Sequence, residues 1–347
     1  MELPKYSGTI HPEEWLKQVK VLCYFKQITN EQEILKICKL MIDSAITISN
    51  EINTFDELIK VLKSHSTFNI FKDSCKRKLQ VMKYIPEKEK NYTATFLANF
   101  RSYCNDAEIK NLEEIKKFLF NTYSSNEFFK NEFIRRIDST IFVDFNPSNE
   151  IIKIFNDVVF DELNIIRYNS LIALRHVSTG KYLSSYEINY QTGSQRQVVF
   201  AGENLYNNPR ALWVLISYKY HLKESYQQDM VFYNDNFYLK HKETNKIFGI
   251  SYIYKSPTTK QSEAFCWNNI DDRTKCQFVS KNNYDAFYVK SNDTVNLKTI
   301  EDTETEDHFL RSHDFTFTIN DEKFQEVVGH TDRIGANDEW CIELIEN

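Results

Sequence analysis

The chain has 347 residues, more than one hydrophobic core usually supports, so we expect two domains. Hydrophobic residues make up 41% of it while glycine (7) and proline (6) are scarce, and this composition excludes a largely disordered chain. The net charge of −6 excludes the bulk positive field of a duplex nucleic-acid binder, so we expect no nucleic acid as a partner.

The first half of the chain has apolar residues at helical spacing. Pro12 suits the first turn of a helix, and Trp15 and Val19 follow on one face. Thr54 and Glu57 have the spacing of a capping box, which predicts another helix start. These patterns predict an all-α helical bundle over residues 1–163. Further helices are predicted after Asn91, near Leu112, from about 149 to 161, and at about 31–44, 70–82 and 126–136.

Two short segments of this half match a known family in type and order. Tyr6-Ser7-Gly8 precedes the helix that carries Trp15, and residues 92–101 end in Phe-Arg. In these segments the chain resembles retrotransposon Gag proteins. The resemblance implies a capsid-like helical domain that self-associates, but the Cys-x2-Cys-x4-His-x4-Cys knuckle of RNA packaging is absent. A helical bundle unrelated to Gag accounts for the same residues.

After Glu162 the apolar runs become short and alternate, as in strands separated by turns. Residues 174–181 align without gaps on residues 239–246, and a degraded third copy begins at Leu297. The aligned Gly180 and Asn245 both tolerate the left-handed conformation of a tight turn. Units of about 60 residues predict an all-β β-trefoil over residues 165–347, with four strands in each lobe, and hence an α+β multidomain chain. The aromatic residues expected to close the units are Trp213, Phe278 and Trp340.

The first unit carries a more specific motif. His-x3-Gly-x-Tyr-Leu at residues 176–183 is followed by Thr-Gly-Ser-x-x-Gln at residues 192–197. In this pairing the chain resembles the MIR domain, named for protein mannosyltransferases, inositol trisphosphate receptors and ryanodine receptors. The resemblance implies a β-trefoil with a ligand-binding role. It implies no catalysis, because in the mannosyltransferases a separate membrane domain carries the chemistry.

Polar and aromatic side chains crowd the predicted turns and strand ends of this first unit. A cation beside an aromatic edge there could hold a sugar or a phosphate, whereas a residue repeated in the second unit, such as His176 and its counterpart His241, fits a packing or turn role equally well. The candidate ligand-binding residues are His176, Lys181, Tyr182, Ser185, Tyr190, Thr192, Ser194 and Arg196.

The cysteines bear on the compartment. Their number is seven and no Cys-x-x-Cys pair occurs, which predicts buried free thiols rather than a zinc site or a disulfide framework. We also expect no cleaved signal peptide and no retention tail, and the sequence has no apolar run near the ~20 residues of a membrane span. We therefore expect a cytoplasmic protein without a membrane span, with the endoplasmic reticulum as the alternative that the MIR resemblance suggests.

Motifs for catalysis are missing from the sequence. We find no phosphate-binding Gly-x4-Gly-Lys-Ser/Thr loop, His-Glu-x2-His helix, Gly-x-Ser-x-Gly elbow or dinucleotide fingerprint. We therefore expect no enzyme, no cofactor and no metal. The sequence favours a non-catalytic binding or scaffold protein, in which the β-rich half recognises a protein, glycan or small polar ligand and the helical half mediates self-association or partner contact. The alternative is a domesticated Gag-like protein that assembles through its N-terminal domain.

Overall fold

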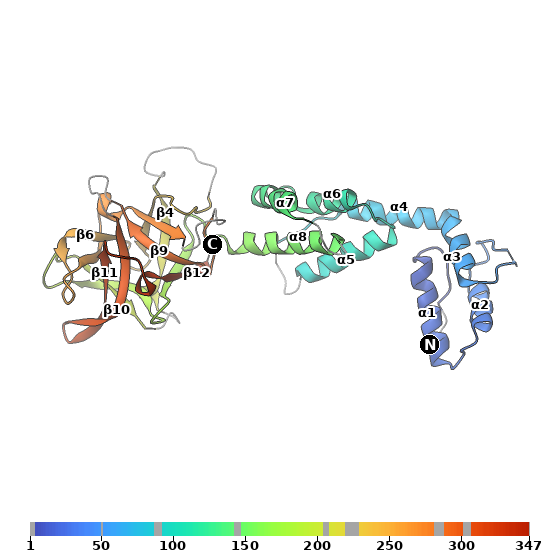
Figure 1. Cartoon of the computed structure of the whole chain (residues 1–347), viewed down its shortest axis with the longest axis horizontal. Helices are drawn as coiled ribbons and strands as arrows, with labels where there is room; N and C mark the ends of the chain where they lie inside the picture. The colour runs from blue at the N-terminus through green and yellow to red at the C-terminus, as the bar shows by residue number, and fades with distance from the viewer. Residues whose placement is uncertain are drawn as a thin grey trace. The chain divides into compact units, whose positions relative to one another are not determined.

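The computed structural model describes residues 4–49, 51–86, 92–141, 147–203, 208–218, 229–280, 288–300 and 307–346. The chain divides into two compact units, Met1–Leu163 and Asn164–Asn347, which we call the helical unit and the barrel unit (Figure 1). Among the described residues, no helix has the length and apolar character that crossing a membrane requires. All seven cysteines are buried free thiols, as the sequence predicts.

Helices account for the regular structure of the first unit, and each lies close to a predicted position. The start predicted at Asn91 lies outside the described residues. The helices are α1 (Pro12–Phe25), α2 (Glu31–Leu40), α3 (Phe55–Ser64), α4 (Ser66–Val81), α5 (Tyr92–Asp106), α6 (Leu112–Tyr123), α7 (Glu127–Ser139) and α8 (Pro147–Asn164).

Local capping explains several of these boundaries. The Asn30 side chain accepts hydrogen bonds from the first backbone N–H groups of α2, and Asn111 does the same for α6. Thr54 and Glu57 form the predicted capping box at the start of α3. The core then holds the helices together. The indole of Trp15 is fully buried on α1 and donates a hydrogen bond to the carbonyl of Pro4 at 2.8 Å.

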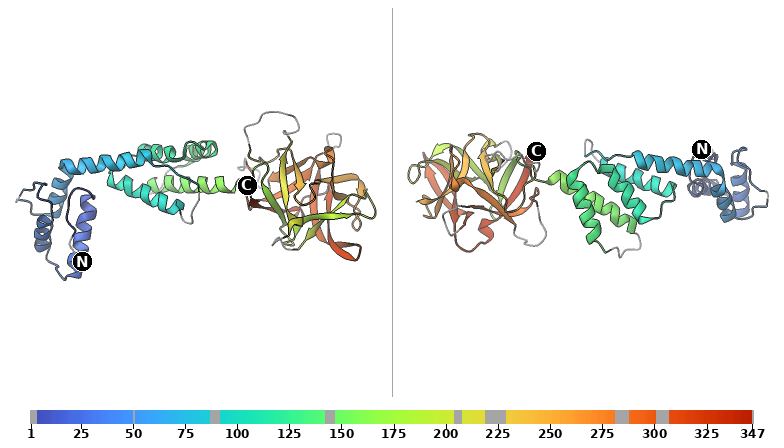
Figure 2. Two further views of the ribbon diagram at one scale, coloured as in Figure 1. Left: turned by 180° about the vertical axis from the view of Figure 1, so that it is seen from behind. Right: turned by 90° about the horizontal axis from the view of Figure 1, so that it is seen from above.

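The second unit is a single antiparallel sheet of twelve strands that closes on itself (Figures 1 and 2). The strand order is β10-β11-β3-β2-β1-β12-β9-β8-β5-β6-β7, with β4 between β1 and β5, and the pairings β10–β9, β11–β7 and β3–β7 complete the closure. The strands are β1 (Leu171–His176), β2 (Tyr182–Asn189), β3 (Gln197–Gly202), β4 (Trp213–Ser217), β5 (Phe237–His241), β6 (Ile247–Lys255), β7 (Ser262–Trp267), β8 (Cys276–Ser280), β9 (Thr294–Thr299), β10 (His308–Ile319), β11 (Glu322–His330) and β12 (Trp340–Glu346).

The predicted fold class, an all-α helical bundle followed by an all-β β-trefoil, is corrected in its second part to a closed antiparallel β-barrel. The finding that overturns it is the pairing of strands across the repeat boundaries: β4 pairs with β5, β8 with β9, and β12 with β1. All three units therefore contribute to one continuous closed sheet. A sequence repeat predicts similar strands in each unit, but how the unit ends pair depends on long-range contacts that no local pattern reports.

The repeat itself is visible in the backbone of the barrel. Asn169, Asn234 and Asn292 each precede the first strand of a unit and have positive φ values of 71°, 65° and 70°. Their backbone N–H groups donate to the carbonyls of Leu215, Phe278 and Ile342, at 2.7, 2.9 and 2.7 Å. Asparagine tolerates this left-handed conformation better than most residues, which accounts for its recurrence. Gly180 and Asn245 are left-handed as predicted, with φ values of 70° and 59°.

Large aromatic side chains fill the barrel interior. Trp213 and Trp340 are fully buried, and their indole N–H groups donate to the carbonyls of Leu183 and Leu310 at 2.7 and 3.1 Å. In the middle unit the first residue of the corresponding strand is Cys276, and the predicted closing residue Phe278 lies two residues later. The sequence prediction therefore identified two of the three closing positions.

We expect Trp340→Ala to lower the free energy of unfolding by about 3–5 kcal/mol, because it removes a buried indole and leaves a cavity. Urea unfolding of the whole chain would measure this. Phe315→Ala is the control, because that side chain is 56% exposed and its removal should change the stability by less than about 0.5 kcal/mol. Equal losses in the two variants would contradict the core role of Trp340.

Candidate functional site

Two of the singled-out histidines hold tight turns together. The Nε2–H group of His176 donates to the carbonyl of Asn337 at 3.0 Å, and its Nδ1 lies 2.9 Å from the hydroxyl of Thr179. His241 repeats this arrangement with the carbonyl of Arg210 and the hydroxyl of Thr244, at 3.0 and 2.9 Å. Both imidazoles are fully buried against a tryptophan, His176 on Trp340 and His241 on Trp213. His176 therefore has the packing role and does not face a ligand.

Ser185 and Tyr190 are also internal. The Ser185 hydroxyl donates to the carbonyl of Val198 at 2.6 Å and accepts from the amide of Gln197 at 2.8 Å. The Tyr190 hydroxyl lies within hydrogen-bonding distance of two strand carbonyls, those of Val199 and Ala264. Only 3% of Tyr190 is exposed, so neither residue is accessible to a ligand.

Lys181 and Tyr182 lie on the outside of the barrel and are engaged there. Lys181 pairs with Glu203 at 3.5 Å, and the Tyr182 hydroxyl donates to Glu343 at 3.0 Å. Glu343 also receives the guanidinium of Arg175 at 2.6 Å. Since each polar group already has a partner, these two residues form local surface bridges.

The remaining predicted residues, Thr192, Ser194 and Arg196, come together on the loop between β2 and β3. Thr192 is exposed at its tip. The Ser194 hydroxyl donates to the buried carboxylate of Glu263 on β7, and its backbone N–H donates to the same carboxylate at 3.3 Å. Gly193 has a positive φ of 71°, and a side chain there would collide with Glu263. The glycine is thus required both by the turn and by the approach of this carboxylate.

The contact between Ser194 and Glu263 has a counterpart in the next unit. Glu326 on β11 accepts hydrogen bonds from the backbone N–H groups of Thr258 and Thr259, at 2.7 and 3.0 Å. A buried carboxylate that recurs against the hairpin of the preceding unit is a structural device. Burial raises the pKa of Glu263, while the hydrogen bonds from Ser194 oppose that rise.

Arg196 differs from these residues because its guanidinium makes no hydrogen bond or ion pair with any residue in the described part of the chain. Its guanidinium carbon lies 4.3 Å from the ring centre of Phe265 and 4.8 Å from that of Trp267, so two aromatic rings of β7 hold it in place. Among the described residues, no hydrogen-bond partner reaches its enclosed Nη1 atom. Gln261 occupies the equivalent place before β7, so the second unit does not repeat this cation.

The electrostatic surroundings of Arg196 make its charge costly. Burial lowers the pKa of the guanidinium, and the neighbouring Arg273 adds like-charge repulsion. Asp271 and Glu263 carry opposite charges nearby, but Asp271 receives hydrogen bonds from Arg273, at 2.5 Å for the shortest, and Glu263 receives them from Ser194. An arginine remains charged at neutral pH, so the protein supplies a half-buried cation with an unused donor.

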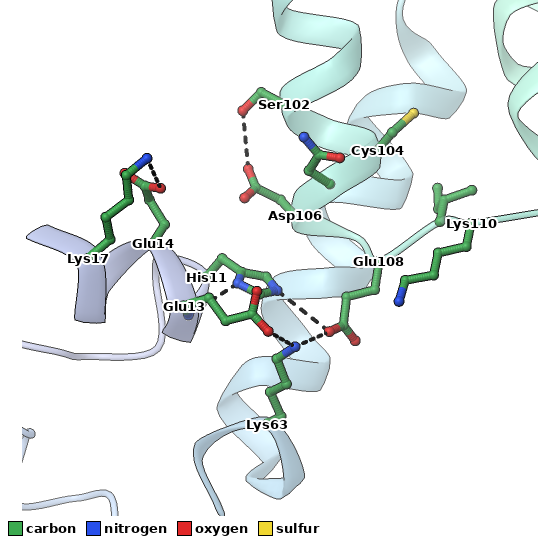
Figure 3. A pocket seen from close by; sticks show the side chains of 12 residues that line it. His11, Glu13, Glu14, Lys17, Lys63, Ser102, Cys104, Asp106, Glu108 and Lys110 are labelled. Carbon is green, nitrogen blue, oxygen red and sulfur yellow. Dashed lines mark hydrogen bonds and ion pairs between the residues drawn. The ribbon is translucent and has the colours of Figure 1, made fainter. Parts of the chain in front are cut away.

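A cavity that the sequence did not predict lies in the helical unit. A polar cavity of about 550 Å³ is lined by the start of α1, the end of α3 and the end of α5 with the segment that follows (Figure 3). Lys63 bridges Glu13 and Glu108 across it at 2.6 Å each. These residues come from segments 45 to 50 positions apart, and no motif signals that they meet. Within the described residues, no group of three or more His, Cys, Asp and Glu side chains could hold a metal ion.

Comparison with known proteins gives limited information. No family model and no curated protein matches the sequence. Among solved structures, the chain is similar to an SDF2-like protein from Arabidopsis thaliana, with 24% identity over 51% of this chain and 94% of that chain and a TM-score of 0.45. A Caenorhabditis elegans protein with unknown function gives 18% identity, coverage of 52% and 97%, and a TM-score of 0.44.

The Saccharomyces cerevisiae protein O-mannosyltransferase Pmt1-Pmt2 complex bound to the sugar donor gives 16% identity, coverage of 73% of this chain and 44% of that chain, and a TM-score of 0.44. With identities below 25% and TM-scores below 0.5, these similarities carry no argument about what this chain binds. They also give no support to the predicted relation to Gag proteins.

The buried histidines predict a pH dependence of stability. Burial lowers the pKa of both His176 and His241 in the folded chain, and the backbone N–H of Thr244 donates to Nδ1 of His241, which requires a neutral ring. Below the ordinary histidine pKa of about 6.5, the unfolded chain binds more protons than the folded chain, so stability falls as the pH falls. We expect a decrease of up to about 1.4 kcal/mol per histidine for each pH unit below 6.5.

Urea unfolding between pH 7.5 and 5 would measure this slope, with the double variant His176→Asn/His241→Asn as the comparison. The variant should be less stable at pH 7.5 and should lose less stability on acidification. Identical slopes in the two proteins would contradict the neutral, buried state of these rings.

Proposed function

We propose that this chain is a non-catalytic binding protein whose barrel recognises an anionic group at Arg196. The observation that carries the proposal is the guanidinium held between Phe265 and Trp267 with an enclosed Nη1 that lacks a partner among the described residues. An unsatisfied N–H on a charged group costs free energy when it is enclosed. A carboxylate, sulfate or phosphate would satisfy it with a charge-assisted hydrogen bond.

The aromatic rings beside Arg196 favour a ligand that offers a flat or polyhydroxylated ring next to its charge. Trp267 is partly exposed and Tyr254 is 39% exposed on the neighbouring hairpin. Aromatic faces next to a cation suit an acidic sugar or a phosphorylated polyol, which pairs its charge with the arginine and packs its ring on the aromatic surface. The resemblance of residues 176–197 to the MIR domain, in which a ligand-binding role is presumed, supports the same class of function.

Binding without catalysis fits the chemistry near Arg196. Ser194 is the nearest potential nucleophile, but its hydroxyl donates to Glu263 and accepts the backbone N–H of Arg196 at 3.1 Å. Both contacts shape the turn, and the recurrence of the carboxylate as Glu326 shows that this arrangement belongs to the fold. A nucleophile needs a general base that can accept its proton and leave it free to attack, and here the hydroxyl is held in place.

We expect inositol hexakisphosphate or a sulfated heparin disaccharide to raise the thermal unfolding midpoint of the chain. Arg196→Gln should weaken binding of the stabilising ligand at least about tenfold, because it removes the only charge that the proposal assigns to recognition. Arg196→Lys should give an intermediate loss, since lysine keeps the charge but lacks the planar fork. The measurements are thermal shift and isothermal titration calorimetry.

The control variant is Lys242→Gln, which removes an exposed cation from the turn of the second unit without touching β7. It should bind as the wild type does. Wild-type affinity in Arg196→Gln, or no stabilisation of the wild type by either compound, would overturn the proposed anion site. The assembly roles predicted for the helical unit, self-association and its Gag-like alternative, stay predictions that light scattering on the whole chain can test.

A further inference from the structure

We propose that the polar cavity of the helical unit is a second binding site, which takes an organic cation between Asp106 and Glu14. The cavity lies within one unit and does not depend on the anion site of the barrel. Its volume of about 550 Å³ falls in the range of small-ligand pockets, and its lining comes from α1, α3, α5 and the segment after α5.

The carboxylates on the floor of the cavity are paired with cations of the chain itself. Lys63 lies 2.6 Å from both Glu13 and Glu108. Glu108 has two further cationic neighbours, Lys72 at 3.5 Å and the imidazole of His11 at 3.6 Å. The hydrogen bond from Lys63 lowers the pKa of Glu13, and the same contact lowers that of Glu108 against the effect of burial. The carboxylates of the floor are thus matched by the chain itself and leave nothing for a ligand to neutralise.

Asp106 at the mouth of the cavity is different. It is the last residue of α5, so the negative end of the helix dipole adds to its own charge. Its carboxylate accepts a hydrogen bond from the hydroxyl of Ser102 at 3.4 Å, and no lysine or arginine of the described residues lies within ion-pair distance. Burial raises the pKa of Asp106 and repulsion from Glu14 adds to that effect, while the nearby His11 and Lys78 and the hydrogen bond from Ser102 oppose it.

Glu14 and Asp106 approach the cavity from opposite sides (Figure 3). The cation beside Glu14 is Lys17, at 3.9 Å on the same helix, and 74% of the Lys17 side chain is exposed. Such an exposed pair contributes little, and the lysine can move into solvent without loss. The remaining cation of the rim, Lys110, is exposed. A cation placed between the two carboxylates would relieve their repulsion and would pair with Asp106.

The geometry favours an organic cation over a metal ion. Two carboxylates are fewer than the ligands that a divalent ion takes from a protein cage, and the described residues offer no group of three. An alkylammonium or guanidinium ion needs one or two carboxylates and also fills volume with its carbon chain. The side chains of Ile109 and Cys104 give the cavity an apolar part for such a chain. The cation can belong to a small polyamine or to a basic side chain of a peptide.

Isothermal titration calorimetry on the whole chain at low salt tests the site with two probes, spermidine and the blocked peptide Ac-Ala-Lys-Ala-NH2. We expect at least one of them to bind. Heat from spermidine alone assigns the site to free amines, and heat from the peptide assigns it to a basic side chain. Binding should weaken as the pH is lowered from 7 toward the raised pKa of Asp106, because the protonated acid cannot pair with the cation. No binding by either probe would overturn the proposal.

Asp106→Asn should weaken binding at least tenfold, and Glu14→Gln should weaken it to a smaller degree. Asp73→Asn is the matched control, because it makes the same chemical change at an exposed position of α4 and should leave binding unchanged. Without ligand, Asp106→Asn should unfold at the wild-type temperature or higher, since the carboxylate it removes is half-buried and makes no ion pair with a lysine or arginine among the described residues. Wild-type affinity in both Asp106→Asn and Glu14→Gln would overturn the site.

Discussion

Closing the sheet without an unpaired edge is the constraint on which the barrel depends. Exposed strand edges are open to pairing with other chains, so a sheet of short strands gains from closure. One hydrogen bond recurs three times within the barrel, from the left-handed residues Asn169, Asn234 and Asn292 at the unit starts to carbonyls of β4, β8 and β12, the last strands of the same units. Each such bond ties the start of a unit to its own last strand, and the strand pairs β4–β5, β8–β9 and β12–β1 join one unit to the next.

The repeat also distinguishes residues that stabilise the fold from residues that are available for binding. His176 and His241 make the same two contacts in two units, and Glu263 and Glu326 brace two successive hairpins. Features that recur in this way serve the turns. Arg196 has no counterpart in the second unit, where Gln261 stands in its place. Its guanidinium makes no ion pair among the described residues, which is why it carries the proposed function.

The same comparison of satisfied and unsatisfied charges applies in the helical unit. Glu108 is surrounded by cations, so its burial is compensated within the chain. Asp106, only two residues away, is left at a helix end with a hydroxyl as its donor and a second carboxylate across the cavity. Burying a charge without an ionic partner costs free energy, and both sites proposed for this protein are argued from a charge in this state.

The sequence by itself determined what depends on neighbouring residues. It predicted the helices, since caps such as Thr54 with Glu57 act within one turn, and it predicted the left-handed turns at Gly180 and Asn245, since these follow from the residue type. It also named Arg196 as one of eight ligand-binding candidates, and this stays a prediction.

Only the tertiary structure decided the rest. The closure of the sheet depends on strand pairs such as β1 with β12, which join the first and last strands of the barrel unit. The cavity depends on the contact between Lys63 and Glu108, which lie 45 positions apart in the sequence. The surroundings of Arg196 depend on which side chains of β7 lie against its guanidinium. Long-range contacts of this kind leave no period or spacing in the sequence, because the residues that meet are selected by the packing of whole elements.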